Sequence, residues 1–344
     1  METELIKVTE KDTDTLARAA AILRHGGLVV FPTETVYGLG GDATDADAAR
    51  KIYAAKGRPS DNPLIIHIAD PRDAEKYAYT NDLYYKLADA FMPGPITVIL
   101  KRKPIIPLSV TGGLETVAVR CPSHPVAHAL IEATGVPIAA PSANLSGKPS
   151  PTCARHVADD MMGRVDMILD GGSSEIGLES TIVKADDGNA TLLRPGGITF
   201  DMLRSVCPDV TVARAVKEQI GKDEHPLSPG MKYKHYAPAT PVVLLSGEEQ
   251  KILAFLRAEQ AKKKCVILCY DEEVPQLTDT GLLLPIGSSA HPETEAHRLF
   301  YLLRDADRFH ADVIYAHLPE EDGIGLALYN RLIRASAHTI KKID

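Results

Sequence analysis

The sequence has few cysteines, no excess of basic residues and no long apolar run. None of its apolar stretches reaches the roughly 18 residues of a membrane span, and Met-Glu-Thr-Glu at the start lacks the basic-then-apolar pattern of a signal peptide. The five cysteines are odd in number and scattered, which argues against a disulfide framework. The formal net charge of -8 argues against a broad surface for nucleic acid. These absences predict a cytoplasmic protein without a membrane partner.

Two of the cysteines, Cys265 and Cys269, fall on an apolar segment that reads as a strand. Core packing and metal binding are both compatible with this spacing, and core packing is favoured because a free cysteine behaves as a small apolar side chain. No protein metal site is predicted.

The most informative stretch runs from Leu28 to Gly41. Residues 28–31 are apolar and predict a buried strand, which Pro32 ends because it has no backbone donor. Residues 33–35, Thr-Glu-Thr, then stand at the edge of the sheet, where ligands bind in open α/β folds. Glycines at 38, 40 and 41 are expected to let the backbone turn sharply or approach a ligand closely.

Several further apolar strands end in polar or basic side chains. In residues 116–120, alternation places Thr116, Ala118 and Arg120 on one face of a strand. The strand at 137–141 opens into the Ser142–Pro151 loop, and the segments at 177–184 and 192–197 carry Ser180 and Arg194. Such strand ends on a single sheet predict one polar cavity with several positive charges, which suits a polyanion and a small polar co-substrate.

For Arg120, His67 and the pair Lys56 and Arg58, a structural role is as compatible with the sequence as a role in ligand binding. Arg120 either awaits an anionic ligand or forms an internal salt bridge with a core acid. His67, inside the strand at 64–69, is either a satisfied core residue or a ligand. Lys56 and Arg58, either side of Gly57 at a helix end, complement the helix dipole or form an anion site. The helix start at Thr44, with Asp47 three residues later, resembles an N-cap.

The glycine-rich string also fits a dinucleotide fingerprint, G-x-G-x-x-A at 38–43, but six residues separate it from the strand where a tight turn is needed. A nicotinamide oxidoreductase therefore stays a weak alternative. An RNA-binding module is the second one, and the acidic balance disfavours it.

Alternating strand and helix patterns restart after residue 240, which predicts two domains. The boundaries are a catalytic domain at 1–206, a linker or lid at 207–239, and a smaller Rossmann-like parallel α/β domain at 240–344. The linker contains a Pro-rich run at 225–238 with two Tyr, two Lys and a His. A plain tether would more often be Gly/Ser-rich, so this run is expected to fold onto something.

Four long motifs in order carry a resemblance. They are Phe-Pro-Thr-Glu-Thr-Val-Tyr-Gly-Leu-Gly, Lys-Gly-Arg-Pro-Ser-Asp-Asn-Pro-Leu, Ala-Pro-Ser-Ala-Asn-Leu-Ser-Gly and Leu-Arg-Pro-Gly. These resemble the YrdC-like catalytic domain. With Ser-Pro-Gly-Met-Lys-Tyr-Lys-His-Tyr-Ala-Pro and a C-terminal α/β domain, the whole chain is similar to the long form of the L-threonylcarbamoyladenylate synthases. The implied fold is a twisted, open mixed sheet with flanking helices, followed by the smaller α/β domain.

The resemblance implies a nucleotidyltransferase that condenses L-threonine, bicarbonate and ATP, with Mg²⁺ carried on the phosphates. The product would pass to a separate tRNA threonylcarbamoyl transferase, without stable binding of tRNA to this chain. The resemblance also implies three sets of site residues with different roles. Those for threonine are Thr35, His67, Arg120, Ala140 and Ser180. Those for ATP are Arg58, Asn62, Thr116, Ser142, Ser150, Arg194 and, on the linker, Tyr236. The family's central polar group corresponds to Lys56, Arg58, Ser142 and Asn144.

Overall fold

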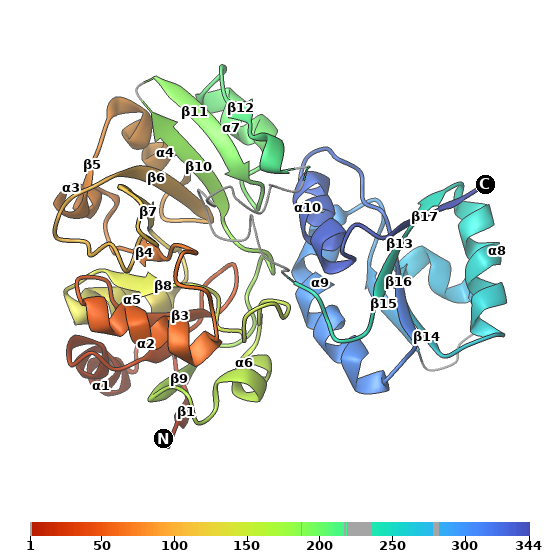
Figure 1. Ribbon diagram of the computed structural model, residues 1–344, viewed down its shortest axis with the longest axis horizontal. Helices are drawn as coiled ribbons and strands as arrows, with labels where there is room; N and C mark the ends of the chain where they lie inside the picture. Colours follow the sequence, from red (N-terminus) through yellow and green to blue (C-terminus); the bar gives the residue numbers. More distant parts are fainter. Residues whose placement is uncertain (1, 187, 217, 219–235, 278–281) are drawn as a thin grey trace. The chain divides into compact units, whose positions relative to one another are not determined.

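The computed structural model describes residues 2–186, 188–216, 218, 236–277 and 282–344. The chain folds into two compact units, which we describe separately (Figure 1). The first comprises the described residues within 1–146, 150–175 and 179–233, and the second those within 147–149, 176–178 and 234–344. Residues 219–235, which include most of the Pro-rich run at 225–238, lie outside the described residues.

A twisted, mixed sheet organises the first unit, in the order β1-β9-β2-β3-β8-β4-β7-β6-β10-β11-β12 with β5 paired to β6. Its parallel and antiparallel pairs alternate irregularly, as the YrdC-like expectation requires. The strands are β1 (Glu4–Lys7), β2 (Val29–Phe31), β3 (Gly38–Asp42), β4 (Ile65–His67), β5 (Ala78–Tyr79), β6 (Ile96–Arg102), β7 (Thr116–Arg120), β8 (Ile138–Ala140), β9 (Met167–Asp170), β10 (Thr181–Asp186), β11 (Asn189–Arg194) and β12 (Thr211–Val212).

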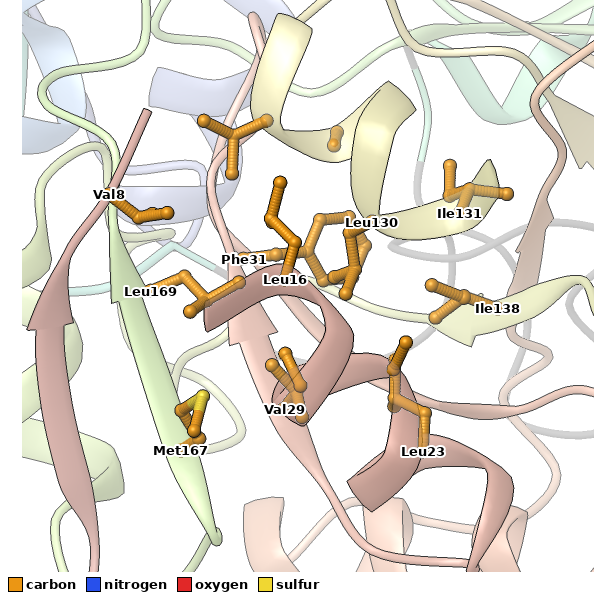
Figure 2. Packing of buried hydrophobic residues seen from close by; sticks show 14 of the residues in the cluster. Val8, Leu16, Leu23, Val29, Phe31, Leu130, Ile131, Ile138, Met167 and Leu169 are labelled. Carbon is orange, nitrogen blue, oxygen red and sulfur yellow. The ribbon is translucent and has the colours of Figure 1, made fainter. Parts of the chain in front are cut away.

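Helices flank this sheet, and two of them contribute to an apolar cluster on it. The helices are α1 (Thr13–Arg24), α2 (Ala46–Lys56), α3 (Ala74–Tyr77), α4 (Asp82–Phe91), α5 (Pro125–Thr134), α6 (Ala154–Met161) and α7 (Phe200–Val206), with short 3-10 turns at Pro71–Asp73 and Arg214–Val216. Leu16 and Leu23 of α1 and Leu130 of α5 pack on Val29 and Phe31 of β2 (Figure 2). Burial of these side chains fixes the face of the sheet that is closed to solvent.

The glycine-rich string corrects one prediction. Residues 38–42 are not a turn but strand β3, antiparallel to β2, and Gly40 lies opposite Val29. A Cβ at Gly40 would come within 2.8 Å of Ile138 Cγ2 and 2.9 Å of the Phe31 ring. The glycines are therefore explained by close side-chain packing across the strands, and a dinucleotide fingerprint, which needs glycines between strand and helix, is excluded.

The start of α2 corrects a second prediction. Asp45, not Thr44, is the N-cap: its side chain accepts a hydrogen bond from the Asp47 N–H at 2.8 Å. The Thr44 hydroxyl and N–H instead both donate to the Asp42 carboxylate. The reason is that β3 continues to Asp42, which places an acceptor next to Thr44. The sequence pattern also does not predict the short strands β1 and β12.

The second unit is a five-stranded sheet in the order β15-β14-β16-β13-β17, with every neighbouring pair parallel. This confirms the Rossmann-like expectation. Its elements are β13 (Val242–Gly247), α8 (Glu249–Gln260), β14 (Cys265–Tyr270), β15 (Leu283–Gly287), α9 (Pro292–Ala306), β16 (Val313–His317), α10 (Gly325–Ala335) and β17 (Ile340–Ile343), with 3-10 turns at Asp271–Gln276 and Asp307–Phe309. The edge strand β17 is a further element that the sequence pattern does not predict.

Cys265 and Cys269 lie in the apolar cluster of this unit beside Ile252, Leu256 and Ile267. The preference for core packing is thereby confirmed. Over the described ranges, no three His, Cys, Asp or Glu side chains gather as a metal site. None of the helices in the described part of the chain has the length and apolarity needed to cross a bilayer.

Candidate active site

A row of polar side chains crosses neighbouring strands of the first unit at one position along the sheet. His67 of β4 pairs in register with Arg120 of β7, and Val119 of β7 pairs with Val98 of β6. Thr97 therefore follows on β6 beside Arg120, and its hydroxyl reaches Ser180, which directly precedes β10, at 2.8 Å. Because residues in register share a face of the sheet, the row lies on one side of it.

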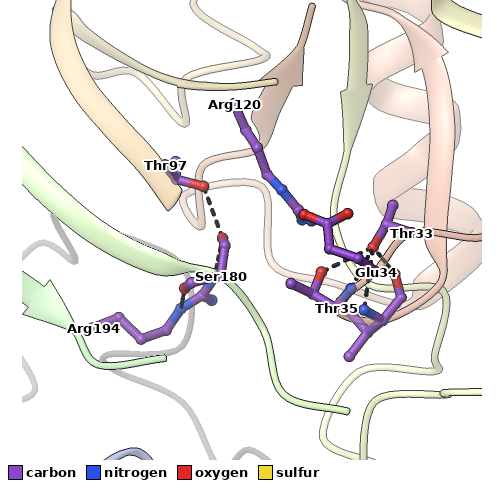
Figure 3. Close-up of polar contacts among 8 residues, drawn as sticks. Thr33, Glu34, Thr35, Thr97, Arg120, Ser180 and Arg194 are labelled. Atoms are coloured by element: carbon purple, nitrogen blue, oxygen red, sulfur yellow. Dashed lines mark hydrogen bonds and ion pairs between the residues drawn. The ribbon is translucent and has the colours of Figure 1, made fainter. Parts of the chain in front are cut away.

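Arg120 forms a buried ion pair with Glu34. The Nη2 atom donates to Glu34 Oε1 at 2.8 Å, and both residues are 4% exposed. Figure 3 shows the two side chains facing one another, with the Thr33–Thr35 hydroxyl pair beside Glu34. The internal salt bridge that the sequence leaves open is therefore present. Arg120 Nε and Glu34 Oε2, both buried, have no hydrogen-bond partner among the described residues.

His67 is a neutral imidazole in this environment. Burial, followed by the positive charge of Arg120, lowers the pKa of His67 to about 3. Nδ1 lies 3.2 Å from the Ile65 carbonyl oxygen and 3.3 Å from that of Ile138, so this nitrogen carries the proton and donates. The Phe31 ring meets the imidazole edge-on, with the centroids 5.9 Å apart. The other ring nitrogen, Nε2, is then an acceptor.

Arg194 contacts Ser180 at the end of the row away from His67. Its Nε donates to the Ser180 carbonyl oxygen at 3.1 Å and its Nη2 to the Ser180 hydroxyl at 3.3 Å (Figure 3). Arg194 ends β11, which pairs antiparallel with β10, so the hairpin between these strands brings the guanidinium to Ser180. The arrangement gives two buried guanidinium groups, Arg120 and Arg194, on one row.

The last residue of α2, Lys56, contacts the loop that begins at Ser142. Lys56 is 2% exposed, and its Nζ donates to the Ser142 carbonyl, to the Asn144 carbonyl at 2.6 Å and to Asn144 Oδ1 at 3.2 Å. The Ser142 hydroxyl also donates to Asn144 Oδ1. The structure thus brings together three of the four residues expected as a central polar group.

Arg58, the fourth, is fixed by its own loop. Gly57 adopts the left-handed conformation, with φ 60°, and turns the chain after α2. Arg58 Nε then donates to the Asn62 carbonyl at 3.2 Å and Nη2 to the Pro63 carbonyl at 3.1 Å. Asn62 is 2% exposed, and its Oδ1 has no hydrogen-bond partner in the described part of the chain.

The other expected residues differ in their surroundings. The Ser150 hydroxyl donates to Glu179 Oε1, and both residues are buried. Thr116 begins β7 and is half-buried. The Ala140 side chain belongs to the apolar cluster under α1 and α5, which leaves the backbone of that residue as its polar part.

Tyr236 belongs to the second unit. It is 2% exposed, its ring stacks on Phe300 with centroids 5.2 Å apart, and the Arg331 guanidinium lies 5.7 Å from the ring centroid.

Sequence reasoning misses three residues that hold expected site residues in place: Glu34, Thr97 and Glu179. Glu34 is recognisable as an acid inserted between two threonines just after a buried strand, and a core acid is one of the two partners expected for Arg120. Thr97 sits inside an ordinary strand pattern, and no feature of the sequence separates it from its neighbours.

Comparison with known proteins gives two family models that together match most of the chain. Residues 21–196 match the family described as telomere recombination, Sua5_yciO_yrdC, and residues 198–337 match the C-terminal domain of threonylcarbamoyl-AMP synthase.

The similar proteins include enzymes of both bacteria and archaea. Threonylcarbamoyl-AMP synthase of Bacillus subtilis is 46% identical over 323 residues, covering 93% of this chain and 92% of the relative. That of Pyrococcus abyssi is 44% identical over 353 residues, covering 99% and 100%. The crystal structure of P. abyssi Sua5 complexed with L-threonine superposes with a TM-score of 0.91 at 40% identity, covering all of both chains. With both domain families matched in order and near-complete coverage of its relatives, the chain belongs to the two-domain threonylcarbamoyl-AMP synthase family.

Proposed function

We propose that this chain condenses L-threonine, bicarbonate and ATP into threonylcarbamoyl-AMP and pyrophosphate, with the polar row of the first unit as the threonine site. The observation that carries the proposal is the buried Arg120, whose Nε–H has no partner among the described residues although Glu34 holds its Nη2. A buried guanidinium donor without an acceptor is costly, and a carboxylate is the ligand that best satisfies it. L-threonine is the ligand named in the P. abyssi Sua5 structure.

In this proposal Arg120 binds the carboxylate of threonine. The Thr35 and Ser180 hydroxyls, the acceptor nitrogen of His67 and the backbone of Ala140 contact the rest of the amino acid. A neutral His67 can accept a hydrogen bond from the threonine hydroxyl without repelling its ammonium group. The assignment uses the neutral form of His67 that burial and the Arg120 charge favour by lowering its pKa.

The remaining candidate residues are assigned to ATP binding. We assign Arg58, Asn62, Thr116, Ser142, Ser150 and Arg194 to the nucleotide and its phosphates, and Lys56 and Asn144 to the support of the Ser142 loop. We also assign Tyr236, whose ring stacks on Phe300, to the nucleotide. Hydroxyls, amides and guanidinium groups suit phosphates better than they suit a hard divalent cation, so Mg²⁺ is proposed to arrive bound to ATP and not to a protein site.

The chemistry then needs no protein nucleophile. The bound ammonium group of threonine first releases a proton to solvent. The resulting amine and bicarbonate form a carbamate with loss of water, and a carbamate oxygen attacks the α-phosphorus while pyrophosphate leaves. The protein contributes orientation, exclusion of water and positive charge near the phosphates. We propose that the reaction takes place in the cytoplasm and that the product passes to a tRNA threonylcarbamoyl transferase, without stable binding of tRNA to this chain.

The direct test is pyrophosphate release from ATP by the purified full-length chain. We expect release that requires both L-threonine and bicarbonate, with threonylcarbamoyl-AMP as the adenylate product by mass spectrometry. Release at the same rate without threonine, or AMP as the sole adenylate, would contradict the proposed reaction.

A further inference from the structure

The ion pair between Glu34 and Arg120 leaves one acceptor and one donor unused. Glu34 Oε1 is bonded to Arg120 Nη2, while Glu34 Oε2 and Arg120 Nε are buried and have no hydrogen-bond partner in the described part of the chain. Both side chains are about 5% exposed. Buried polar groups in folded proteins almost always have hydrogen-bond partners, and an unsatisfied group costs free energy. The two unsatisfied atoms of this pair are therefore available for hydrogen bonds to a ligand.

The two unused atoms define what that ligand carries. The carboxylate oxygen requires a hydrogen-bond donor and the guanidinium nitrogen requires an acceptor, on one molecule or on two. The pair itself contributes one negative and one positive charge, and the neighbouring His67 is neutral, so these three side chains carry no net charge. A neutral ligand with a cationic donor next to an anionic acceptor is a zwitterion. An α-amino acid has this pattern on adjacent groups.

Resting on the proposed function, we propose that Glu34 binds the α-ammonium group of threonine through Oε2, while Arg120 Nε binds its carboxylate. Glu34 is then a substrate-binding residue that makes the site select α-amino acids over hydroxy acids. A site built to hydrogen-bond a polar group discriminates strongly against an analogue that lacks it, because its own buried group is left unpaired. The selection matters because the amine is the group that becomes the carbamate.

The test compares two ligands in matched variants by isothermal titration calorimetry of the full chain. The ligands are L-threonine and 2,3-dihydroxybutanoate of the same configuration, in which a hydroxyl replaces the amine. Glu34→Gln keeps the carbonyl oxygen that accepts from Arg120 but replaces Oε2 by an NH₂ group, which cannot accept from an ammonium. Glu273→Gln is the control: Glu273 is 1% exposed and paired with His317 in the second unit.

We expect the wild type and Glu273→Gln to prefer threonine over the hydroxy acid by about 10- to 100-fold, the range of a charge-assisted hydrogen bond. In Glu34→Gln the threonine affinity should fall by about 10-fold or more while that of the hydroxy acid changes far less. The preference then largely disappears.

Equal weakening of both ligands in Glu34→Gln would overturn the inference, because it would mean that Glu34 only holds Arg120. Should Glu34→Gln not fold, the wild type decides by itself: equal affinity for threonine and the hydroxy acid overturns the inference, and a preference for threonine supports it. Loss of the proposed function has a different result, which is an absence of threonine-dependent pyrophosphate release in the wild type.

Discussion

The two units of this chain treat buried polar groups differently. In the first unit, Glu34 and Arg120 are paired, yet each retains a buried atom without a partner among the described residues. In the second unit, buried carboxylates link elements of the sheet: Glu259 accepts from Tyr315 at 2.7 Å and from Lys263, and His317, stacked on Tyr270, lies 2.9 Å from Glu273 Oε1. Glu273 Oε1 also has no hydrogen-bond partner among the described residues, but no unsatisfied donor of its ion-pair partner accompanies it.

The difference follows from sheet architecture. The second sheet is parallel throughout, and apolar side chains from α8, β14 and β16 form its core. The first sheet mixes directions, so strand ends from distant parts of the sequence meet in one row. In the proposed function, a ligand completes the hydrogen bonds of the polar residues in that row. What distinguishes the Glu34–Arg120 pair is an unsatisfied acceptor and an unsatisfied donor on the two partners of one ion pair, because single unsatisfied atoms occur in both units.

Arg120→Ala has the largest expected effect. Removing one partner of a buried ion pair leaves Glu34 charged and unpaired, which should cost about 3–5 kcal/mol of stability, measured by denaturant unfolding. In the variant that remains folded, the KM for threonine should rise by about 100-fold and the KM for ATP far less, since the lost contact is to a carboxylate.

His317→Ala supplies the matched comparison, because it breaks the buried pair with Glu273 in the second unit. It should lower stability while leaving both KM values unchanged. Equal increases in the two KM values for Arg120→Ala would contradict the assignment of Arg120 to the threonine carboxylate. The ion pair of the first unit would then not differ from that of the second in its effect on threonine binding.

The pH dependence of stability should have opposite signs in the two units. Burial raises the pKa of Glu295, in α9, to about 7, so the folded state keeps a proton that the unfolded chain releases near 4.5. Stability of the second unit should therefore fall as the pH rises from about 4.5 through 7, by about 3 kcal/mol in total. For His67, with its pKa lowered to about 3, stability of the first unit should instead fall as the pH drops below about 6.5.

The contribution of Glu295 is measured by denaturant unfolding of Glu295→Gln and the wild type at several pH values between 4.5 and 8. The variant should lose the decline and be the more stable protein at pH 8. A decline of the same size in both proteins would show that Glu295 is not its source.

The smallest effect concerns the start of α2, the helix that carries Lys56 at its other end. Asp45→Ala removes the cap acceptor and should cost about 1 kcal/mol. Thr44→Ala removes only the hydroxyl hydrogen bond to Asp42, keeps the one from the backbone N–H, and should cost less, about 0.5 kcal/mol. Thermal melting measures the loss of stability in each variant. A larger loss in Thr44→Ala than in Asp45→Ala would show that Thr44 is the N-cap after all.

The sequence is sufficient to nominate candidate site residues because period-two alternation and strand ends are local features. Five residues alone assign Arg120 and Thr116 to one face, and neighbouring apolar runs locate His67 and Ser180 at their ends. What joins them is the sheet order, in which β4 lies beside β7 and β6 beside β10. No local pattern contains that order, so the partner of Arg120 can be narrowed to an acid but not to Glu34.

The fold elements that the sequence pattern misses share a physical cause. Strand β3 contains three glycines, and a residue without a side chain leaves no alternation to detect. Strands β1 and β17 lie at the edges of their sheets and are largely exposed, so their burial pattern is weak. Both cases depend on neighbours that only the folded chain brings close.

The Lys56 contacts have a consequence for how the Ser142–Asn144 loop behaves when substrates enter. Lys56 takes the carbonyls of Ser142 and Asn144, while the N–H groups of Ala143 and Leu145 donate to the Tyr37 carbonyl at 2.8 Å and to Asp160 at 3.1 Å. The loop is thus clamped from both sides before any ligand arrives. In the proposed function, the loop binds ATP without a further loss of conformational entropy, because that entropy is already lost when the chain folds.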